Sequence, residues 1–182
     1  MEFAEREIRL KDGRTAILRA PRIEDAAELI GYLRTVTGET PFLTQYPDEV
    51  RFTLEQEEEF LRGRIADPRG AMILATVDGE HAGNGSFMSL GGNRRYAHRC
   101  SLGIALYRKY CGLGLGRGLM EFALELARDC GYEQAELEVV ADNARAVALY
   151  ESLGFEVYGR HPRDVKYDDG SYADALLMTK GL

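Results

Sequence analysis

Apolar positions recur along this chain with two different spacings, and the spacing separates predicted strands from predicted helices. Alternating apolar and polar residues predict strands at residues 3–10, 14–20, 72–77, 82–90, 96–106, 136–140, 155–160 and 172–179. Apolar residues three or four positions apart predict helices with one buried face at residues 26–33, 53–66, 115–130 and 143–153. The resulting order, β-β-α-α-β-β-β-α-β-α-β-β, predicts an α/β fold with a mixed, mostly antiparallel central sheet.

Short polar sequences between these segments predict tight turns and one helix start. Three of them predict turns between strands: Asp12-Gly13, Asp78-Gly79 and Asp168-Asp169-Gly170. Thr53 and Gln56 form a capping box that starts the second helix, and its run from Glu55 to Glu59 is expected to face solvent. Residues 38–52 form a long loop, whose aromatic rings either close over a substrate or fix the loop to the core.

Length and charge narrow the classes of protein that this chain can represent. Its 182 residues fit one domain, residues 1–182, and the apolar fraction of 45% is sufficient for a core. The formal net charge of -7 argues against binding nucleic acid over the whole surface. This acidity either serves solubility alone or attracts a cationic substrate.

The cysteines and the apolar runs bear on compartment and on metal binding. Cys100, Cys111 and Cys130 are an odd number of thiols without close pairing, so neither a disulfide framework nor a structural zinc site is expected. Free thiols are typical of a reducing compartment, which predicts a cytoplasmic protein. The charged N-terminus does not look like a signal peptide, and no apolar run is long enough to span a membrane.

The stretch between the strand ending at Leu106 and the helix starting at Leu115 carries the candidate chemistry. Its glycines, Gly112, Gly114 and Gly116, allow backbone N–H groups to turn inward. Unpaired N–H groups and the dipole of the next helix favour a phosphate or pyrophosphate, although a flexible or tightly packed turn is the alternative. The P-loop and the dinucleotide fingerprint do not fit, because no Lys-Ser or Lys-Thr follows and the third glycine is misplaced.

Two motifs, one on each side of the predicted strand–helix–strand crossover, carry a resemblance to a known family. Cys111-Gly112-Leu113-Gly114-Leu115-Gly116 resembles the Gln/Arg-x-x-Gly-x-Gly/Ala pyrophosphate loop of the GCN5-related N-acetyltransferases (GNAT), with Cys111 replacing the usual Gln or Arg. The stretch from Leu137 to Phe155 resembles the family's Leu-x-Val…Asn-x-x-Ala-x-x-Leu-Tyr-x-x-x-Gly-Phe signature. The two motifs follow one another at the family's usual distance.

The resemblance implies a GNAT fold, with helices on both faces of the sheet and a parallel strand pair that splays apart around acetyl-CoA. The splayed strands would be residues 102–106 and 137–140. The backbone of Ile104, Ala105 and Leu106 would bind the pantetheine arm and the acetyl carbonyl, and Asn143 would bind the pantetheine side. The pyrophosphate loop would comprise Cys111, Gly112, Leu113, Gly114, Leu115, Gly116 and Arg117.

The resemblance also implies roles for two side chains in proton transfer. Tyr150 matches the tyrosine that protonates the departing thiolate, a task that suits a phenol because it is neutral at pH 7; alternatively it only packs on the core. The strand before the glycine loop lacks the family's usual glutamate, and Glu138 is the best candidate for the base. A paired surface role for Glu138, a water chain and His98 as base are the alternatives.

The implied activity is direct transfer of the acetyl group of acetyl-CoA to a primary amine. The amine would be a protein N-terminus, a polyamine or a small amine. The alternatives are a transferase of a different acyl-CoA, a catalytically silent acyl-CoA-binding or regulatory domain, and a dinucleotide-binding domain. Edge strands near the C-terminus allow a homodimer.

Overall fold

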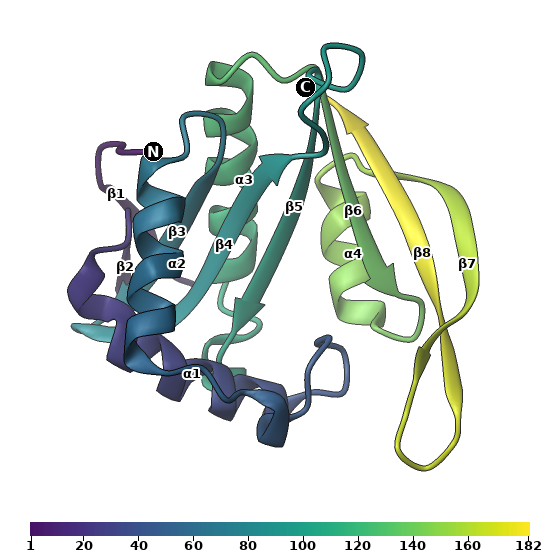
Figure 1. The fold of residues 1–182 in the computed structure, drawn as a ribbon, viewed down its shortest axis with the longest axis horizontal. Helices are drawn as coiled ribbons and strands as arrows, with labels where there is room; N and C mark the ends of the chain where they lie inside the picture. Colours follow the sequence, from purple (N-terminus) through teal and green to yellow (C-terminus); the bar gives the residue numbers. More distant parts are fainter.

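The strands of this chain form an eight-stranded sheet in the order β1-β2-β3-β4-β5-β6-β8-β7 (Figure 1). The computed structural model describes all residues from 1 to 182. The strands are β1 (Arg6–Arg9), β2 (Thr15–Arg19), β3 (Ala71–Val77), β4 (Glu80–Ser89), β5 (Arg99–Leu106), β6 (Gln134–Val140), β7 (Glu156–Lys166) and β8 (Tyr172–Gly181). The helices are α1 (Ala26–Glu39), α2 (Leu54–Ala66), α3 (Leu115–Asp129) and α4 (Ala144–Ser152). The element order predicted from the sequence is confirmed.

Neighbouring strands run antiparallel except at the centre of the sheet. There β5 and β6 run parallel, and they pair only through Arg99–Ser101 and Gln134–Glu136. Beyond these residues the two strands diverge toward their C-terminal ends (Figure 1). Each still pairs on its outer side, β5 with β4 and β6 with β8. The sheet is therefore open in its middle, as the resemblance implied.

Helices cover both faces of the sheet and bury an apolar stripe against it. The stripe of α3 from Leu115 to Ala127 lies in the larger core, together with Tyr150 of α4. Leu29 of α1, Leu61 of α2 and Leu74 of β3 belong to a smaller cluster on the opposite face. Burying a leucine-sized side chain contributes roughly 1.5–3 kcal/mol, so these two clusters fix the helices on the sheet. None of the helices combines the length and the apolar character needed to cross a bilayer.

The close approach of β4 to β5 depends on a glycine. A Cβ at Gly83 would lie 2.6 Å from the carbonyl oxygen of Ala105 and 2.9 Å from the Cα of Leu106. Both are backbone atoms, which cannot turn aside as the end of a side chain can. Gly83 also lies beside a register irregularity between β3 and β4. The glycine therefore allows β4 to support the part of β5 that borders the central opening.

Several predicted boundaries differ from those in the structure. β1 is shorter than residues 3–10, and α1 extends to Glu39, into the predicted loop. β5 starts at Arg99 because the preceding residues form turns, in which the N–H of Tyr96 donates to the carbonyl of Asn93. β7 continues past residue 160 because Pro162 lies within a register shift on an edge strand, where its missing N–H costs no hydrogen bond of the ladder.

Candidate active site

The opening between β5 and β6 is closed at one end by an ion pair. Arg99 of β5 and Glu136 of β6 form a bidentate pair, with 2.7 Å between Nη2 and Oε2. Glu136 is buried, and the hydrogen bond from Arg99 holds the pKa of its carboxyl below the usual value. Past this pair no strand covers the facing edges of residues 102–106 and 137–140. The backbone assigned to the pantetheine arm, at residues 104–106, thus borders the opening.

The glycine loop at the end of β5 forms a cradle of free backbone N–H groups. None of the six N–H groups from Gly112 to Arg117 donates a hydrogen bond to an oxygen of the chain. Gly112 and Gly114 have φ values of +80° and +93°, which a residue with a Cβ adopts only with strain. Gly114 is also the N-cap of α3. Free N–H groups at the start of a long helix form the arrangement that binds a phosphate.

The surroundings of the loop hold it in place. The N–H of Lys11, in the β1–β2 turn, donates to the carbonyl of Leu113 over 3.0 Å, a support that the sequence did not indicate. A Cβ at Gly116 would lie 3.4 Å from side-chain atoms of Ile104 and Leu106, so α3 starts in contact with β5. The thiol of Cys111 donates to the carbonyl of Tyr107, while the guanidinium of Arg117 donates to Ser152 of α4.

Two residues predicted to act at the site, Asn143 before α4 and Tyr150 within it, have different surroundings. The side chain of Asn143 caps the helix, with its Oδ1 accepting a hydrogen bond from the N–H of Ala146 at 3.3 Å. Tyr150 is buried and its ring packs 6.0 Å from that of Phe155, centroid to centroid. Burial raises the pKa of Tyr150 to about 12, so the phenol keeps its proton at neutral pH. Tyr150 therefore packs on the core and also holds a proton that it is able to donate.

Glu138, the predicted base, lies on β6 where β5 no longer pairs with it. It is exposed, and its Oε1 lies 3.8 Å from Nδ1 of His161, which in turn lies 2.6 Å from Asp164. His98, the alternative base, precedes β5 at the paired end of the opening. A rise of about 3.3 Å per residue puts it about 20 Å from Ile104, too far for direct contact with the same substrate atom.

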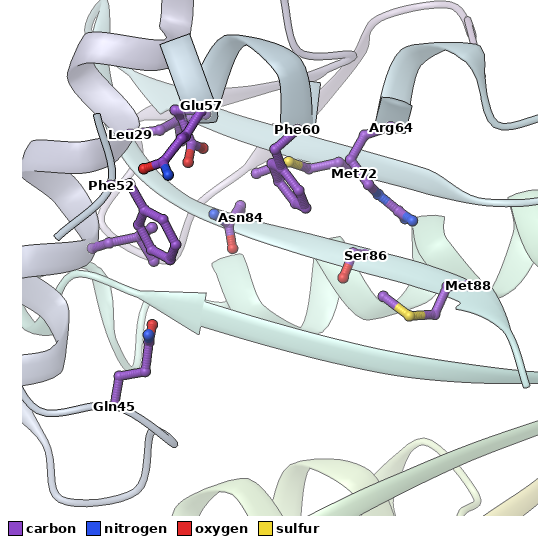
Figure 2. A pocket seen from close by; sticks show the side chains of 12 residues that line it. Leu29, Gln45, Phe52, Glu57, Phe60, Arg64, Met72, Asn84, Ser86 and Met88 are labelled. Carbon is purple, nitrogen blue, oxygen red and sulfur yellow. The ribbon is translucent and has the colours of Figure 1, made fainter. Parts of the chain in front are cut away.

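A cavity of about 470 Å³ lies between α1, α2 and β4, on the sheet face next to the opening (Figure 2). Its apolar lining consists of Leu29, Leu33, Phe52, Phe60, Met72 and Met88. Its polar lining consists of Gln45, Gln56, Glu57, Arg64, Asn84 and Ser86. Asn84 and Ser86 lie directly opposite Ala105 and Gly103 of β5, and opposite residues share one face of a sheet. The floor of the cavity is therefore one strand away from the opening.

Comparison with known proteins decides the family of the chain. The sequence matches the acetyltransferase (GNAT) family over residues 37–155, a range that contains both edges of the opening, the glycine loop, α4 and the cavity lining except Leu29 and Leu33. The chain belongs to the GNAT acetyltransferase family. The family, the fold and the class of enzyme expected from the sequence, an acetyl-CoA-dependent N-acetyltransferase, are thereby confirmed.

Individual GNAT proteins resemble the chain to different extents. It is 34% identical over 140 residues to the mycothiol acetyltransferase of Acidothermus cellulolyticus. This alignment covers 71% of the chain but only 42% of that protein. It is 28% identical over 119 residues to the L-amino acid N-acetyltransferase AaaT of Escherichia coli, covering 64% of the chain and 72% of AaaT. The chain thus spans less than half of one curated relative and most of the other.

Solved GNAT structures share the fold over most of the chain. An acetyltransferase of the GNAT family from Streptococcus pneumoniae matches with a TM-score of 0.87 and 31% identity, over 92% of this chain and 99% of that one. YncA from Salmonella typhimurium, solved with its cofactor acetyl-CoA, matches with a TM-score of 0.78 and 21% identity, over 91% of this chain and 92% of that one. Acetyl-CoA is the expected cosubstrate of the family, and this neighbour is consistent with that.

The cavity also contains a carboxylate that was predicted from the sequence to face solvent. Glu57 was expected to face solvent with its neighbours from Glu55 to Glu59, but it is only 4% exposed and points into the cavity. In α2 it shares its buried face with Leu61, one helical turn later. That i, i+4 spacing was the available signal, and the run of five consecutive acidic or amide side chains obscured it.

The loop between α1 and α2 reaches both the cavity and the far side of the opening. Phe52 lines the cavity rather than the core. The N–H of Asp168, in the β7–β8 turn, donates to the hydroxyl of Tyr46 over 3.0 Å. This hydrogen bond joins a segment packed on the β1–β5 side of the sheet to one attached to β6. Other residues of the loop are fixed to the core, because Val50 is buried and Leu43 packs against the smaller cluster, so both roles expected for this loop stay predictions.

Proposed function

We propose that this chain transfers the acetyl group of acetyl-CoA to a primary amine that enters through the cavity between α1, α2 and β4. The observation that carries the proposal is the opening between β5 and β6, which ends on the cradle of six free N–H groups. The free edge of β5 along this opening suits the extended pantetheine arm, and the N–H groups of residues 112–117 at its end suit a pyrophosphate. The cavity lies beside the middle of the opening, where an amine would meet the acyl carbon.

The chain's own backbone would perform most of the cofactor binding. The N–H groups of residues 112–117 would hold the pyrophosphate, and the free edge of β5 at Ile104, Ala105 and Leu106 would bind the pantetheine arm. Asn143, at the start of α4, would approach the pantetheine from the other side. Acetyl-CoA supplies an acetyl group on sulfur, and its carbon–sulfur bond breaks as the new amide bond forms. An N–H donor on the β5 edge would stabilise the oxyanion in this step.

Proton transfer would require a donor for the sulfur and an acceptor for the amine. Tyr150 suits the donor role because its phenol is protonated at neutral pH. Glu138 is the acceptor that the sequence predicts, and it lies on the exposed side of β6 close to His161. General acids of this kind typically contribute a rate factor of about 10²–10⁴.

The first test is thermal stability with and without acetyl-CoA. A ligand present at about 100 times its dissociation constant stabilises the folded state by about 2.7 kcal/mol, or about 5–10 °C in Tm for a chain of this size. Gly116→Val should abolish this rise, because the new side chain would press on Ile104 and Leu106 at the opening. Gly63→Val is the matched control, since nothing lies within 4 Å of a Cβ at this other helical glycine.

The second test follows thiol release from acetyl-CoA with a panel of primary amines. Turnover with at least one amine supports the proposal. Stabilisation by acetyl-CoA without turnover on any amine would favour the catalytically silent acyl-CoA-binding domain instead. Stabilisation by a longer acyl-CoA but not by acetyl-CoA would favour a different acyl donor, and no stabilisation by any CoA compound would refute the cofactor site.

A further inference from the structure

Glu57 is a buried carboxylate without a partner inside the chain. It is 4% exposed, its carboxylate forms no hydrogen bond or ion pair with another residue, and it lines the cavity (Figure 2). Burial alone raises the pKa of its carboxyl. Its carboxylate oxygens are not enclosed by the chain but face the cavity, and a charge that is partly removed from water gains from a ligand that supplies the missing partner. A carboxylate selects a cation or a hydrogen-bond donor, and an acceptor amine is both.

The other charged residue in the cavity lining, Arg64, is not free to bind an anionic group of the ligand next to its amine. Arg64 is the only basic residue in the lining. Its guanidinium donates to the carbonyls of Ala71 and Phe87, at 3.2 and 2.9 Å, and lies 3.5 Å from the carboxylate of Asp67. It is therefore already engaged with the chain. A carboxylate on the ligand would meet Glu57 without a free cation to neutralise it.

The walls of the cavity suit an apolar group attached to the amine. Phe52 and Phe60 are 38% and 51% exposed, an unusual state for phenylalanine, and both face the cavity. Met72 and Met88 continue the apolar wall. Between these side chains, Asn84 and Ser86 offer hydrogen-bonding groups on the side nearest β5. An ammonium at Glu57 would thus leave its apolar substituent against the aromatic rings.

We infer that Glu57 binds the ammonium group of the acceptor and takes its proton, and that the acceptor is an apolar amine with no carboxylate on the amine-bearing carbon. This inference rests on the proposed transfer of an acetyl group to an amine. An arylalkylamine has this chemistry, and so does the N-terminus of a peptide that begins with an apolar residue.

The proton step is a simple transfer between the two groups. One N–H bond of the ammonium breaks, the electron pair stays on nitrogen, and the proton forms an O–H bond on the Glu57 carboxylate. The neutral amine then attacks the acyl carbon, a second proton leaves the nitrogen as the carbon–sulfur bond breaks, and the departing thiolate takes up one proton while Glu57 returns the other to solvent. Glu57 differs from Glu138 here, because Glu138 is exposed and has His161 beside it, whereas Glu57 has no partner.

The experiment measures binding by calorimetry to the full chain saturated with CoA, and in parallel the rate of thiol release from acetyl-CoA. Three probes share one aromatic group: phenethylamine, phenylalaninamide and phenylalanine. The two probes without a carboxylate are expected to bind at least about tenfold more tightly than phenylalanine. A preference between phenethylamine and phenylalaninamide distinguishes a small amine from a peptide N-terminus as the source of the acceptor.

Three variants of α2 isolate the role of Glu57. Glu57→Gln keeps the shape but removes the charge, and should weaken binding of phenethylamine about 10- to 100-fold and remove the acidic limb of the kcat/KM profile against pH. Glu57→Asp should restore part of the affinity. Glu59→Gln is the matched control, since the Glu59 side chain is 80% exposed on the same helix and should leave binding unchanged.

The outcomes separate this inference from the proposed function. Binding of phenethylamine that depends on Glu57, without acetylation of any amine, would support the ammonium site at Glu57 but contradict both N-acetyltransfer and the proton step. Unchanged affinity in Glu57→Gln would overturn the inference, as would phenylalanine binding as tightly as its amide. Loss of the acidic limb in Glu138→Gln but not in Glu57→Gln would assign the proton to Glu138 and overturn it as well.

Discussion

Burial raises the pKa of two side chains of the candidate site, Tyr150 on α4 and Glu57 in the cavity, with opposite consequences for their charge. A phenol is neutral when protonated, so burial favours the form of Tyr150 that exists at pH 7 in any case. A carboxyl is charged at pH 7, so burial of Glu57 opposes its usual form. The Tyr150 phenol is therefore suited to its core, whereas burial of Glu57 favours the uncharged form of its carboxyl unless a cation pairs with it.

Replacing Tyr150 with Phe removes the proposed proton donor while keeping the packing against Phe155. We expect kcat to fall about 10²- to 10³-fold, since general acids contribute factors of this size, with the Kd for acetyl-CoA unchanged. Steady-state kinetics and acetyl-CoA titration check both values. Tyr158→Phe, at a tyrosine that is 56% exposed, should leave kcat as it is. An equal loss in both variants would mean that the effect is not specific to Tyr150.

Replacing Glu57 with Gln is expected to raise Tm in the absence of ligands at pH 7, because it removes an unpaired buried charge. The pKa of Glu57 is raised above its unfolded value of 4.5, so the folded state binds this proton more tightly than the unfolded state. The stabilisation that protonation gives is complete below pH 4.5 and is lost as pH rises through the folded-state pKa. Melting curves from pH 4 to pH 8 should therefore show the variant's advantage growing with pH, and a constant difference would contradict this sign.

At the scale of single residues, the sequence shows the type and spacing of the side chains. It does not show whether one particular side chain of a surface helix is buried. Tyr150 could be singled out because it lies within a recognisable motif. Glu57 could not, because acidic residues surround it and its burial depends on α2 packing over β3 and β4. Contacts between distant segments, such as that of Tyr46 with Asp168, leave no local mark on the sequence.

Among the secondary-structure elements, β4 and β5 depend on the absence of a side chain at Gly83. Gly83→Ala would force a Cβ against backbone atoms of Ala105 and Leu106, and we expect a loss of about 1–3 kcal/mol in the free energy of unfolding. Because these two residues border the opening, the affinity for acetyl-CoA should fall as well. Urea unfolding and ligand titration measure the two effects.

Gly103→Ala is the matched control for Gly83→Ala, because both glycines lie in strands. Nothing lies within 4 Å of a Cβ at Gly103, so this variant should unfold at nearly the same urea concentration as the original chain. If the two variants were equally stable, the close approach at Gly83 would not matter to the fold.

The elements themselves could be predicted well because each has a local pattern. The period of the apolar residues located all four helices and all eight strands, and the capping box at Thr53 and Gln56 is present as expected. The predicted ends of strands were less accurate in two places. β7 continues through Pro162 because it is an edge strand, and turns before Arg99 delay the start of β5. The opening between β5 and β6 was predicted only through family resemblance, since strand pairing depends on partners far away in the sequence.

In the whole molecule, strands β1–β5 form one part of the sheet and β6, β8 and β7 form the other. The two parts are joined by three residue pairs between β5 and β6 and by the ion pair of Arg99 with Glu136. Glu136→Gln should lower the free energy of unfolding by about 1–3 kcal/mol at pH 7, because a partly buried guanidinium loses its charged partner. Arg99 lowers the pKa of Glu136 below 4.5, so this stabilisation is present above pH 4.5 and is lost as pH falls through the folded-state value. The difference from the original chain should therefore vanish in acid, as it does for Glu57→Gln, but at pH 7 the two differences have opposite signs.

The open middle of the sheet also has a consequence for the solution behaviour of the protein. Unpaired strand edges attract other strands, and this chain has two of them facing one another inside its sheet. Without acetyl-CoA, their free N–H and C=O groups are able to pair with a partly unfolded neighbour. Light scattering during slow heating should rise earlier for the free protein than for the acetyl-CoA complex, beyond what the difference in Tm accounts for. The cosubstrate would then also protect the protein against aggregation.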